Sequence, residues 1–350
     1  MRVLVTGHLG YIGPHLVELL RAEGHFVTGV DLNLFEESSV YPHVPPQQNR
    51  VMDIFQLTPR DLEGFDAVMH LAAISNDAMG VLNPELTWKI NYEGTLYVAE
   101  CAKLAGVPRF LLSSSCSVYG KSDDKPIDEN GRPAPVSVYA ETKVKSEAAL
   151  SELADSRFSP VYLRNATAFG SSPRLRLDLV LNNLLASAHS TGVIKVLTDG
   201  TPWRPLIHCR DIARAFVHFL KAPREVIHDE AFNVGSHVET YQVRDVANLV
   251  KRLMPQCELS FAEGATSDPR DYKVDFTKLN GAFPDFHLEY TLEAGARELY
   301  DHFFRHNIPQ DCLTGDRFIR IKTLKRKLRA HEVPEYFQIA EKPFEPAERR

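Results

Sequence analysis

Residues 1–31 read MRVLVTGHLGYIGPHLVELLRAEGHFVTGVD, and this stretch decides the fold. Residues 2–6 form a short β-branched run that predicts a strand, and a glycine-rich turn follows it. Residues 14–22 carry apolar side chains at helical spacing, which predicts a helix. A second apolar run over 25–30 ends on Asp31 and predicts the next strand. Strand, turn, helix and strand in this order begin a βαβ unit.

The turn carries glycines where a dinucleotide site needs them. Gly7 permits a tight turn, Gly10 lets the backbone approach a pyrophosphate, and Gly13 lets helix and strand pack closely. The pyrophosphate would sit at the positive end of the following helix. Asp31 can accept both ribose hydroxyls and would repel a 2′-phosphate, and no arginine follows at Leu32 or Asn33. The pattern therefore predicts NAD rather than NADP, although Asp31 as a turn cap is the alternative.

The same alternation continues along the chain. Strands are expected at 67–71, 109–113 and 160–164, and helices at 91–105 and 138–154, which predicts an α/β fold with a doubly wound parallel (Rossmann) sheet. Beyond residue 166 the pattern loosens into a helix over 178–190, a strand over 194–197, a helix over 211–220 and a returning strand over 231–234. Loops are expected near 255–271.

This pattern predicts three regions. An NAD-binding domain would span 1–165 with returning segments at about 201–235. A smaller, interleaved α/β substrate domain would span 166–200 and 236–310, and a C-terminal extension would span 311–350. The extension carries a basic amphipathic helix over 317–329, for which packing on its own protein is favoured over a phosphate-rich or membrane partner.

Composition narrows the functional classes. A chain of 350 residues with 44% hydrophobic and 25% charged residues matches an ordinary soluble enzyme. The net charge of −6 argues against a nucleic-acid partner. Five scattered cysteines show no metal-ligand spacing, so we expect no metal, and their odd number favours reduced thiols in a cytoplasmic protein. No run reaches the roughly 18 apolar residues of a membrane helix, and a strand beginning at residue 2 leaves no room for a cleaved signal peptide.

A second motif suggests the chemistry. Tyr139 and Lys143 lie four apart on a predicted helix and therefore share one face. A tyrosine needs its pKa lowered from near 10 to act as an acid or base around neutrality, and a nearby ammonium helps to do so. A serine-rich strand end, 113–117, precedes the pair and offers a hydroxyl to the reacting oxygen.

With these motifs the chain resembles the extended short-chain dehydrogenases/reductases, in particular their nucleotide-sugar epimerase/dehydratase branch. The resemblance covers about residues 1–305. It rests on the glycine turn with Asp31, His70-Leu-Ala-Ala73, Asn91, Val118-Tyr-Gly120, Tyr139 with Lys143, and the segments 164–170, 203–208 with Asp211, and 232–235.

The resemblance implies roles for individual residues. Ser115 would orient the substrate, Tyr139 would be the acid/base and Lys143 its partner. A nucleotide-diphosphate sugar would be the substrate, and pairing into a homodimer is common in this fold. The implied cofactor-binding residues are Gly7, Gly10, Tyr11, Ile12, Gly13, Asp31, Asp53, Ile54, Leu71, Ala72, Ala73, Asn91, Tyr139 and Lys143. The implied substrate-binding residues are Ser75, Asn76, Cys116, Ser117, Thr167, Asn183, Arg204 and Arg270.

Several of these assignments have alternatives. Arg204 and Arg270 suit a diphosphate because a guanidinium pairs with two phosphate oxygens, but a structural ion pair is the other interpretation. The loop at Ser75 and Asn76 either sets substrate choice or is a simple turn. Cys116 is a proton shuttle if its pKa is lowered, and otherwise a packing residue.

Two departures from the family pattern bear on which reaction is expected. Sugar-nucleotide 4,6-dehydratases carry an acidic pair where this chain has Cys116 and Ser117, so dehydration is disfavoured, and Thr167 replaces a common asparagine. The leading hypothesis is an NAD-dependent nucleotide-sugar epimerase with a keto-sugar intermediate. A reductase or dehydrogenase with net redox is the alternative, followed by a 4,6-dehydratase or a non-catalytic NAD-binding protein.

Overall fold

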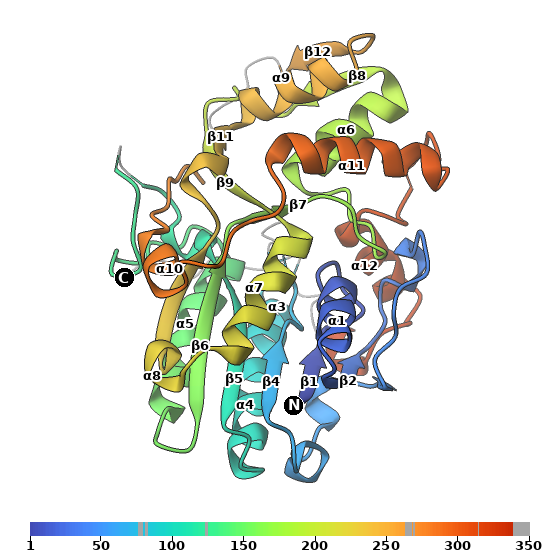
Figure 1. Ribbon diagram of the computed structural model, residues 1–350. Coiled ribbons are helices and arrows are strands. Elements are labelled where there is room, and N and C mark those ends of the chain that lie inside the picture. The colour runs from blue at the N-terminus through green and yellow to red at the C-terminus, as the bar shows by residue number, and fades with distance from the viewer. Residues whose placement is uncertain are drawn as a thin grey trace, which may run out of the picture.

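The structure is a computed structural model that describes residues 1–75, 80, 83–122, 125–262, 268, 270–313 and 315–338. One large sheet with helices on both faces forms the lower part of the molecule in Figure 1. A smaller assembly of helices and short strands lies above its carboxyl edge. The site lies between these two parts.

The large sheet confirms the predicted Rossmann architecture. Within the described residues it has seven strands in the order β10-β6-β5-β4-β1-β2-β3, and every neighbouring pair is parallel. The strands are β1 (Arg2–Thr6), β2 (Phe26–Asp31), β3 (Gln48–Val51), β4 (Ala67–His70), β5 (Arg109–Ser115), β6 (Ser159–Asn165) and β10 (Glu230–Val234). The strand expected over 231–234 does return to this sheet, where it pairs with β6.

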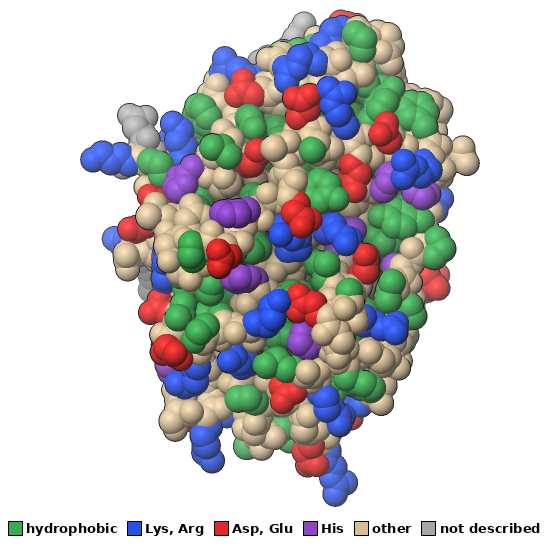
Figure 2. All heavy atoms as spheres, in the orientation of Figure 1, with side chains coloured by type: hydrophobic (Ala, Val, Ile, Leu, Met, Phe, Trp, Pro, Cys, Tyr) green, Lys and Arg blue, Asp and Glu red, His purple; other side chains and the backbone are tan. Residues whose placement is uncertain are grey.

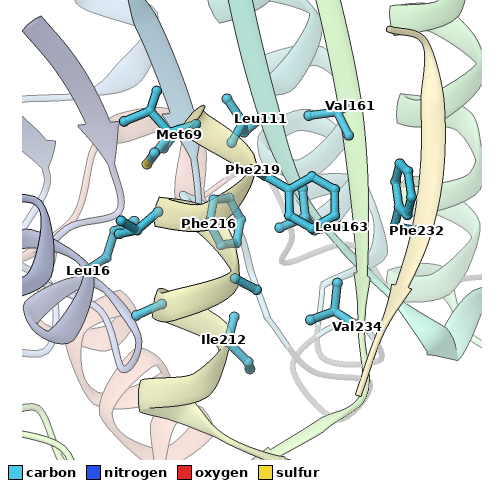
Figure 3. Packing of buried hydrophobic residues seen from close by; sticks show 14 of the residues in the cluster. Leu16, Met69, Leu111, Val161, Leu163, Ile212, Phe216, Phe219, Phe232 and Val234 are labelled. Atoms are coloured by element: carbon cyan, nitrogen blue, oxygen red, sulfur yellow. The ribbon is translucent and has the colours of Figure 1, made fainter. Parts of the chain in front are cut away.

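Helices cover both faces of the sheet. On one face lie α1 (Gly13–Ala22) and α7 (Cys209–Lys221), and on the other lie α4 (Gly94–Leu104) and α5 (Val138–Leu153). Figure 3 shows Phe216 and Phe219 of α7 against the strand residues Leu111 and Leu163. Burial of such large apolar side chains stabilises a fold by about 1.5–3 kcal/mol each. This packing therefore fixes the position of α7 and of residues 203–208, which directly precede it.

The smaller assembly has its own core. It contains α6 (Val180–Thr191), α9 (Val243–Leu253) and α11 (Leu292–Arg305), a sheet of β7 (Thr167–Phe169), β9 (Trp203–His208) and β11 (Thr240–Gln242), and the pair β8 (Val193–Val196) and β12 (Glu258–Phe261). Strand β9 therefore pairs within the smaller assembly, whereas α7, which follows it directly, packs on the large sheet. The division of the chain into domains stays a prediction.

The expectation of loops near 255–271 is wrong for one part of that range, the strand β12. Residues 258–261 pair in parallel with β8. The sequence around them is rich in turn-forming and acidic residues, and the strand forms because β8 supplies its backbone hydrogen-bond partners.

The helix expected over 91–105 is also different at its start. A π-helical segment (Lys89–Glu93) precedes α4 and contains Asn91. The remaining short elements are η1 (Glu36–Ser38), η2 (Ile54–Gln56), η3 (Pro59–Leu62), α3 (Pro84–Trp88), η5 (Cys116–Tyr119), α8 (Arg224–Ile227), η6 (His237–Glu239) and α10 (Thr277–Ala282).

The C-terminal extension folds back onto the chain. Its basic helix is present as α12 (Arg320–Arg329), and η7 (Glu335–Gln338) follows. In Figure 1 α12 lies beside the blue segment that follows β2. Arg317 donates hydrogen bonds to the carbonyl oxygens of Glu37 and Ser39 in that segment, so the helix packs against its own protein.

On the face of the molecule shown in Figure 2, acidic and basic side chains are interspersed. No helix in the described ranges is long and apolar enough to cross a membrane. All five cysteines are buried and unpaired.

Candidate active site

A cavity of about 690 Å³ opens at the carboxyl ends of the central strands. It is lined by the segments that follow β1, β2, β4 and β5, by the start of α5, and by residues of the smaller assembly. The strand order reverses between β1 and β4, and parallel sheets bind their ligands at such a switch point. The volume is typical of sites for small molecules.

The turn after β1 is built for a close approach of backbone. Gly7 has φ +74°, and a Cβ there would lie 2.6 Å from the backbone nitrogen of Ala72. A Cβ on Gly13 would lie 2.3 Å from the carbonyl oxygen of His8. Only glycine fits either position, and the turn therefore leaves the amino end of α1 open to an anion. This cradle fits a dinucleotide diphosphate.

The carboxylate of Asp31 is held at the rim of the same turn. It accepts hydrogen bonds from the backbone N–H of Leu9 at 3.0 Å and of Asn33 at 2.7 Å. Asn33 takes up a left-handed conformation with φ +54° to make this bond. The carboxylate lines the cavity, where it can accept hydrogen bonds from ribose hydroxyls.

The rest of the expected dinucleotide site is brought together with one exception. The cavity is lined by Gly7, Gly10, Tyr11, Ile12, Gly13, Asp31, Asp53, Ile54, Leu71, Ala72, Ala73, Tyr139 and Lys143. Asn91 does not line it. The side chain of Asn91 instead exchanges two hydrogen bonds with the backbone of Ile74 and donates one to Thr142 of α5, so it positions the loop after β4.

The residues expected to be the catalytic pair, Tyr139 and Lys143, lie in the first turns of α5. The Ser137 hydroxyl caps this helix by accepting a hydrogen bond from Ala140. Lys143 is buried; its ammonium donates a 2.8 Å hydrogen bond to the carbonyl oxygen of Ser113 and lies 5.8 Å from the centre of the Tyr139 ring. Burial lowers the pKa of Lys143 to about 8, and the Glu147 carboxylate acts in the opposite direction.

The end of β5 presents its hydroxyls to the cavity. Ser115 caps the turn Cys116–Tyr119 by accepting a hydrogen bond from the Ser117 backbone at 3.1 Å. Ser117 is only 8% exposed, lines the cavity, and its hydroxyl has no partner among the described residues. Buried hydroxyls normally have a hydrogen-bond partner, so Ser117 is suited to meet a polar ligand.

Cys116 has a different position from the one we expected for a substrate-binding residue. It is fully buried in the core, and its thiol donates to the carbonyl oxygen of Arg164 at 3.0 Å. Burial raises the pKa of this thiol far above its ordinary value. Cys116 is therefore placed as a packing residue and does not line the cavity.

The expected substrate-binding residues Ser75, Ser117, Thr167, Asn183, Arg204 and Arg270 all line the cavity, whereas Asn76 lies outside the described residues. The two arginines share the Asp268 carboxylate, with N–O distances of 3.1 Å from Arg204 and 2.5 Å from Arg270. The ion pair that we considered as an alternative is therefore present, and it holds both guanidinium groups at the cavity wall.

Several lining residues were missed by the sequence analysis. Arg176 donates to the Ser75 hydroxyl at 2.8 Å and pairs with Asp178 at 2.6 Å. Arg320, Leu324, Tyr336 and Phe337 come from the C-terminal extension. Residues 171–176 (SSPRLR) are polar and basic, and this composition could have indicated Arg176. No local signal connected the extension to this site.

No cluster of three or more potential metal ligands occurs in the described parts of the chain. The glycine turn, the Asp31 carboxylate at its rim and the Tyr139–Lys143 pair beside the strand-end Ser115 have the arrangement of a dinucleotide-dependent enzyme of the extended short-chain dehydrogenase/reductase class.

Comparison with known proteins names the family. The model of the NAD dependent epimerase/dehydratase family matches residues 3–235, and the chain belongs to this family. It is thus an enzyme of the extended short-chain type, and NAD is its cofactor.

Among curated proteins, the chain is 31% identical over 253 residues to a UDP-glucose 4-epimerase of Mycolicibacterium smegmatis, which covers 69% of this chain and 79% of that protein. It is 30% identical over 289 residues to UDP-glucuronic acid decarboxylase 2 of Arabidopsis thaliana, which covers 79% of this chain. The chain spans 63% of the length of that decarboxylase.

Among solved structures, MoeE5 in complex with UDP-glucose and NAD is 26% identical, with a TM-score of 0.76. The match covers 99% of that chain but 87% of this one. Part of the present chain therefore has no counterpart in MoeE5.

Proposed function

We propose that the chain is a nucleotide-sugar epimerase that oxidises a sugar hydroxyl transiently to a ketone and reduces it again from the opposite face. The single observation that carries the proposal is the cavity itself, which joins the dinucleotide turn, the Tyr139–Lys143 pair and the arginine-lined wall. The relatives support it, because they include UDP-glucose 4-epimerases.

Tyr139 is the acid/base of the proposed reaction. It begins as the phenolate, which the Lys143 ammonium stabilises, and accepts the proton of the sugar hydroxyl. It stays a neutral phenol while the keto sugar exists and then returns the proton, which restores the phenolate. Ser115 orients the reacting oxygen. The bound NAD supplies a reversible hydride acceptor, so no net redox change occurs.

The proposed substrate is a nucleotide-diphosphate sugar, held by Asn183, Arg204 and Arg270. MoeE5 has been solved with UDP-glucose and with UDP-glucuronic acid, and both are suitable first substrates. The absence of a carboxylate from Cys116 and Ser117 supports epimerisation over water elimination, which needs a positioned acid and base.

The test is incubation of the purified enzyme with each UDP-sugar. The proposal predicts a second sugar epimer by NMR, with no change in product mass and no accumulation of NADH. Tyr139→Phe should abolish the conversion while NAD still binds. Stoichiometric NADH production or consumption would instead establish a dehydrogenase or reductase, and loss of water or of carbon dioxide would establish a dehydratase or a decarboxylase.

We also propose that the enzyme is cytoplasmic and works as a homodimer. The burial of all five unpaired cysteines is consistent with a reducing compartment. Light scattering on the purified chain tests the dimer, since a single monomeric species would contradict it.

A further inference from the structure

The C-terminal extension contacts three loops at the carboxyl edge of the large sheet. Leu324 and Phe337 pack with Ile74, in the loop after β4, and with Phe35, in the loop after β2. The Tyr336 hydroxyl donates a 2.5 Å hydrogen bond to the carboxylate of Asp53, which follows β3. Because β4 and β2 flank β1 in the sheet, the extension bridges the two sides of the dinucleotide turn.

Arg320 is the charged residue of this bridge. It is 3% exposed, its guanidinium lies 4.2 Å from the centre of the Phe35 ring, and it lines the cavity. Its hydrogen bonds go to the Ser38 hydroxyl at 2.8 Å and to the carbonyl oxygen of Arg174 at 3.2 Å. None of the carboxylates in the described ranges pairs with it.

The surroundings of Arg320 leave positive charge in excess. Burial and then the neighbouring Arg176 lower the pKa of Arg320 to about 9. Asp178 and Asp31 act in the opposite direction, but Asp178 is already paired with Arg176 at 2.6 Å and Asp31 accepts backbone hydrogen bonds. Arg174 also lies near, and its Nε lacks a hydrogen-bond partner among the described residues. A buried guanidinium without a carboxylate is unfavourable unless an anion joins it.

We propose that the extension is part of the dinucleotide site: Arg320 binds the diphosphate of NAD, and α12 with residues 335–338 covers its adenosine half. Tyr336 holds the Asp53 carboxylate toward the adenine end. The extension thereby slows the release of the cofactor.

The test is calorimetric titration of nucleotide-free protein with NAD, NADP and UDP. A charge-assisted hydrogen bond contributes about 1.5–3 kcal/mol, which corresponds to about a 10- to 150-fold change in Kd. Arg320→Gln should therefore raise the Kd for NAD by about 10- to 150-fold and leave that for UDP unchanged. Arg320→Lys should be intermediate, and Lys325→Gln is the matched control because Lys325 is an exposed cation on the same helix.

Tyr336→Phe gives an independent measurement, which stands even if Arg320→Gln does not fold. Its NAD dissociation rate, followed by stopped-flow displacement, should rise several-fold, whereas that of Lys325→Gln should not. An unchanged Kd for NAD in Arg320→Gln would overturn the proposal, as would an unchanged dissociation rate in Tyr336→Phe.

Other outcomes would also overturn the assignment. A loss confined to NADP would place Arg320 at a 2′-phosphate, and a loss confined to UDP would place it at the substrate. A lower melting temperature without NAD, combined with an unchanged NAD-induced increase, would make Arg320 purely structural. These results do not depend on which sugar reaction the enzyme performs.

Discussion

The ammonium of Lys143 donates a 2.8 Å hydrogen bond to the carbonyl oxygen of Ser113. This bond joins α5, which carries Tyr139, to β5, which ends at Ser115. This buried contact between a helix and a strand therefore helps to hold the three proposed catalytic residues together. Since Lys143 is buried, its charge state affects both the stability and the chemistry of the protein.

The first prediction concerns pH. The pKa of Lys143 is about 8 in the fold and 10.5 in the unfolded chain, so between these values the unfolded chain binds more protons and stability rises with pH. Relative to Lys143→Met, the unfolding free energy of the nucleotide-free protein should rise by about 3 kcal/mol from pH 8 to 10.5. Urea denaturation measures it, and a difference that stays constant with pH would contradict it.

The second prediction concerns the buried ion pair behind β5. Glu147 pairs with Arg164 at 2.6 Å and accepts a hydrogen bond from Ser114 at 2.5 Å. Glu147→Gln leaves Arg164 without its counter-charge and should lower the unfolding free energy by about 3 kcal/mol. In chemical denaturation Glu93→Gln is the control, since Glu93 forms an exposed pair with Lys89 and its loss should change stability by less than about 0.5 kcal/mol. Equal changes in unfolding free energy for Glu147→Gln and Glu93→Gln would contradict the role of Glu147 as the buried counter-charge of Arg164.

The third prediction separates backbone conformation from close approach. Gly7 and Gly64 have nearly equal φ values, +74° and +76°, but only a Cβ at Gly7 meets other backbone atoms. Gly64→Ala should lower stability by about 1–2 kcal/mol and leave NAD binding intact. Gly7→Ala should lower stability further and weaken NAD binding at least 10-fold, because the turn must move away from Ala72. Calorimetric titration with NAD measures the affinity of both variants. Equal NAD affinity would contradict the explanation that a Cβ at Gly7 displaces the turn.

The parts of the fold that depend on local sequence were predictable. β1 begins and ends at the predicted residues, because a β-branched run followed by a required glycine determines both ends. The position of Asp31 at the cavity was predictable for the same reason, since it ends the second strand of the βαβ unit that contains the glycine turn.

Contacts between distant segments were not predictable. Tyr336 and Asp53 form a hydrogen bond although they are 283 residues apart in sequence. The amphipathic pattern of α12 likewise does not indicate that Arg320 and Leu324 line the cavity. Asn91 was assigned to the cofactor by resemblance, but a π-helical segment directs it to the backbone of Ile74. Such orientations depend on the path of the chain rather than on residue type.

The fourth prediction follows from the position of Cys116. Ser115 and Cys116 are adjacent, but the turn after β5 places the thiol in the core, where it touches Arg164 rather than the cavity. Cys116→Ala should therefore leave the kcat of sugar conversion and its pH profile within about 2-fold of the wild type. It should lower stability by about 1–2 kcal/mol, because a small buried side chain is lost. Ser115→Ala removes a hydroxyl of a residue that does line the cavity and should reduce kcat by at least 10-fold. It should also lower stability by about 1 kcal/mol, because the hydroxyl caps the turn after β5. A shifted pH profile in Cys116→Ala would show that the thiol takes part in proton transfer.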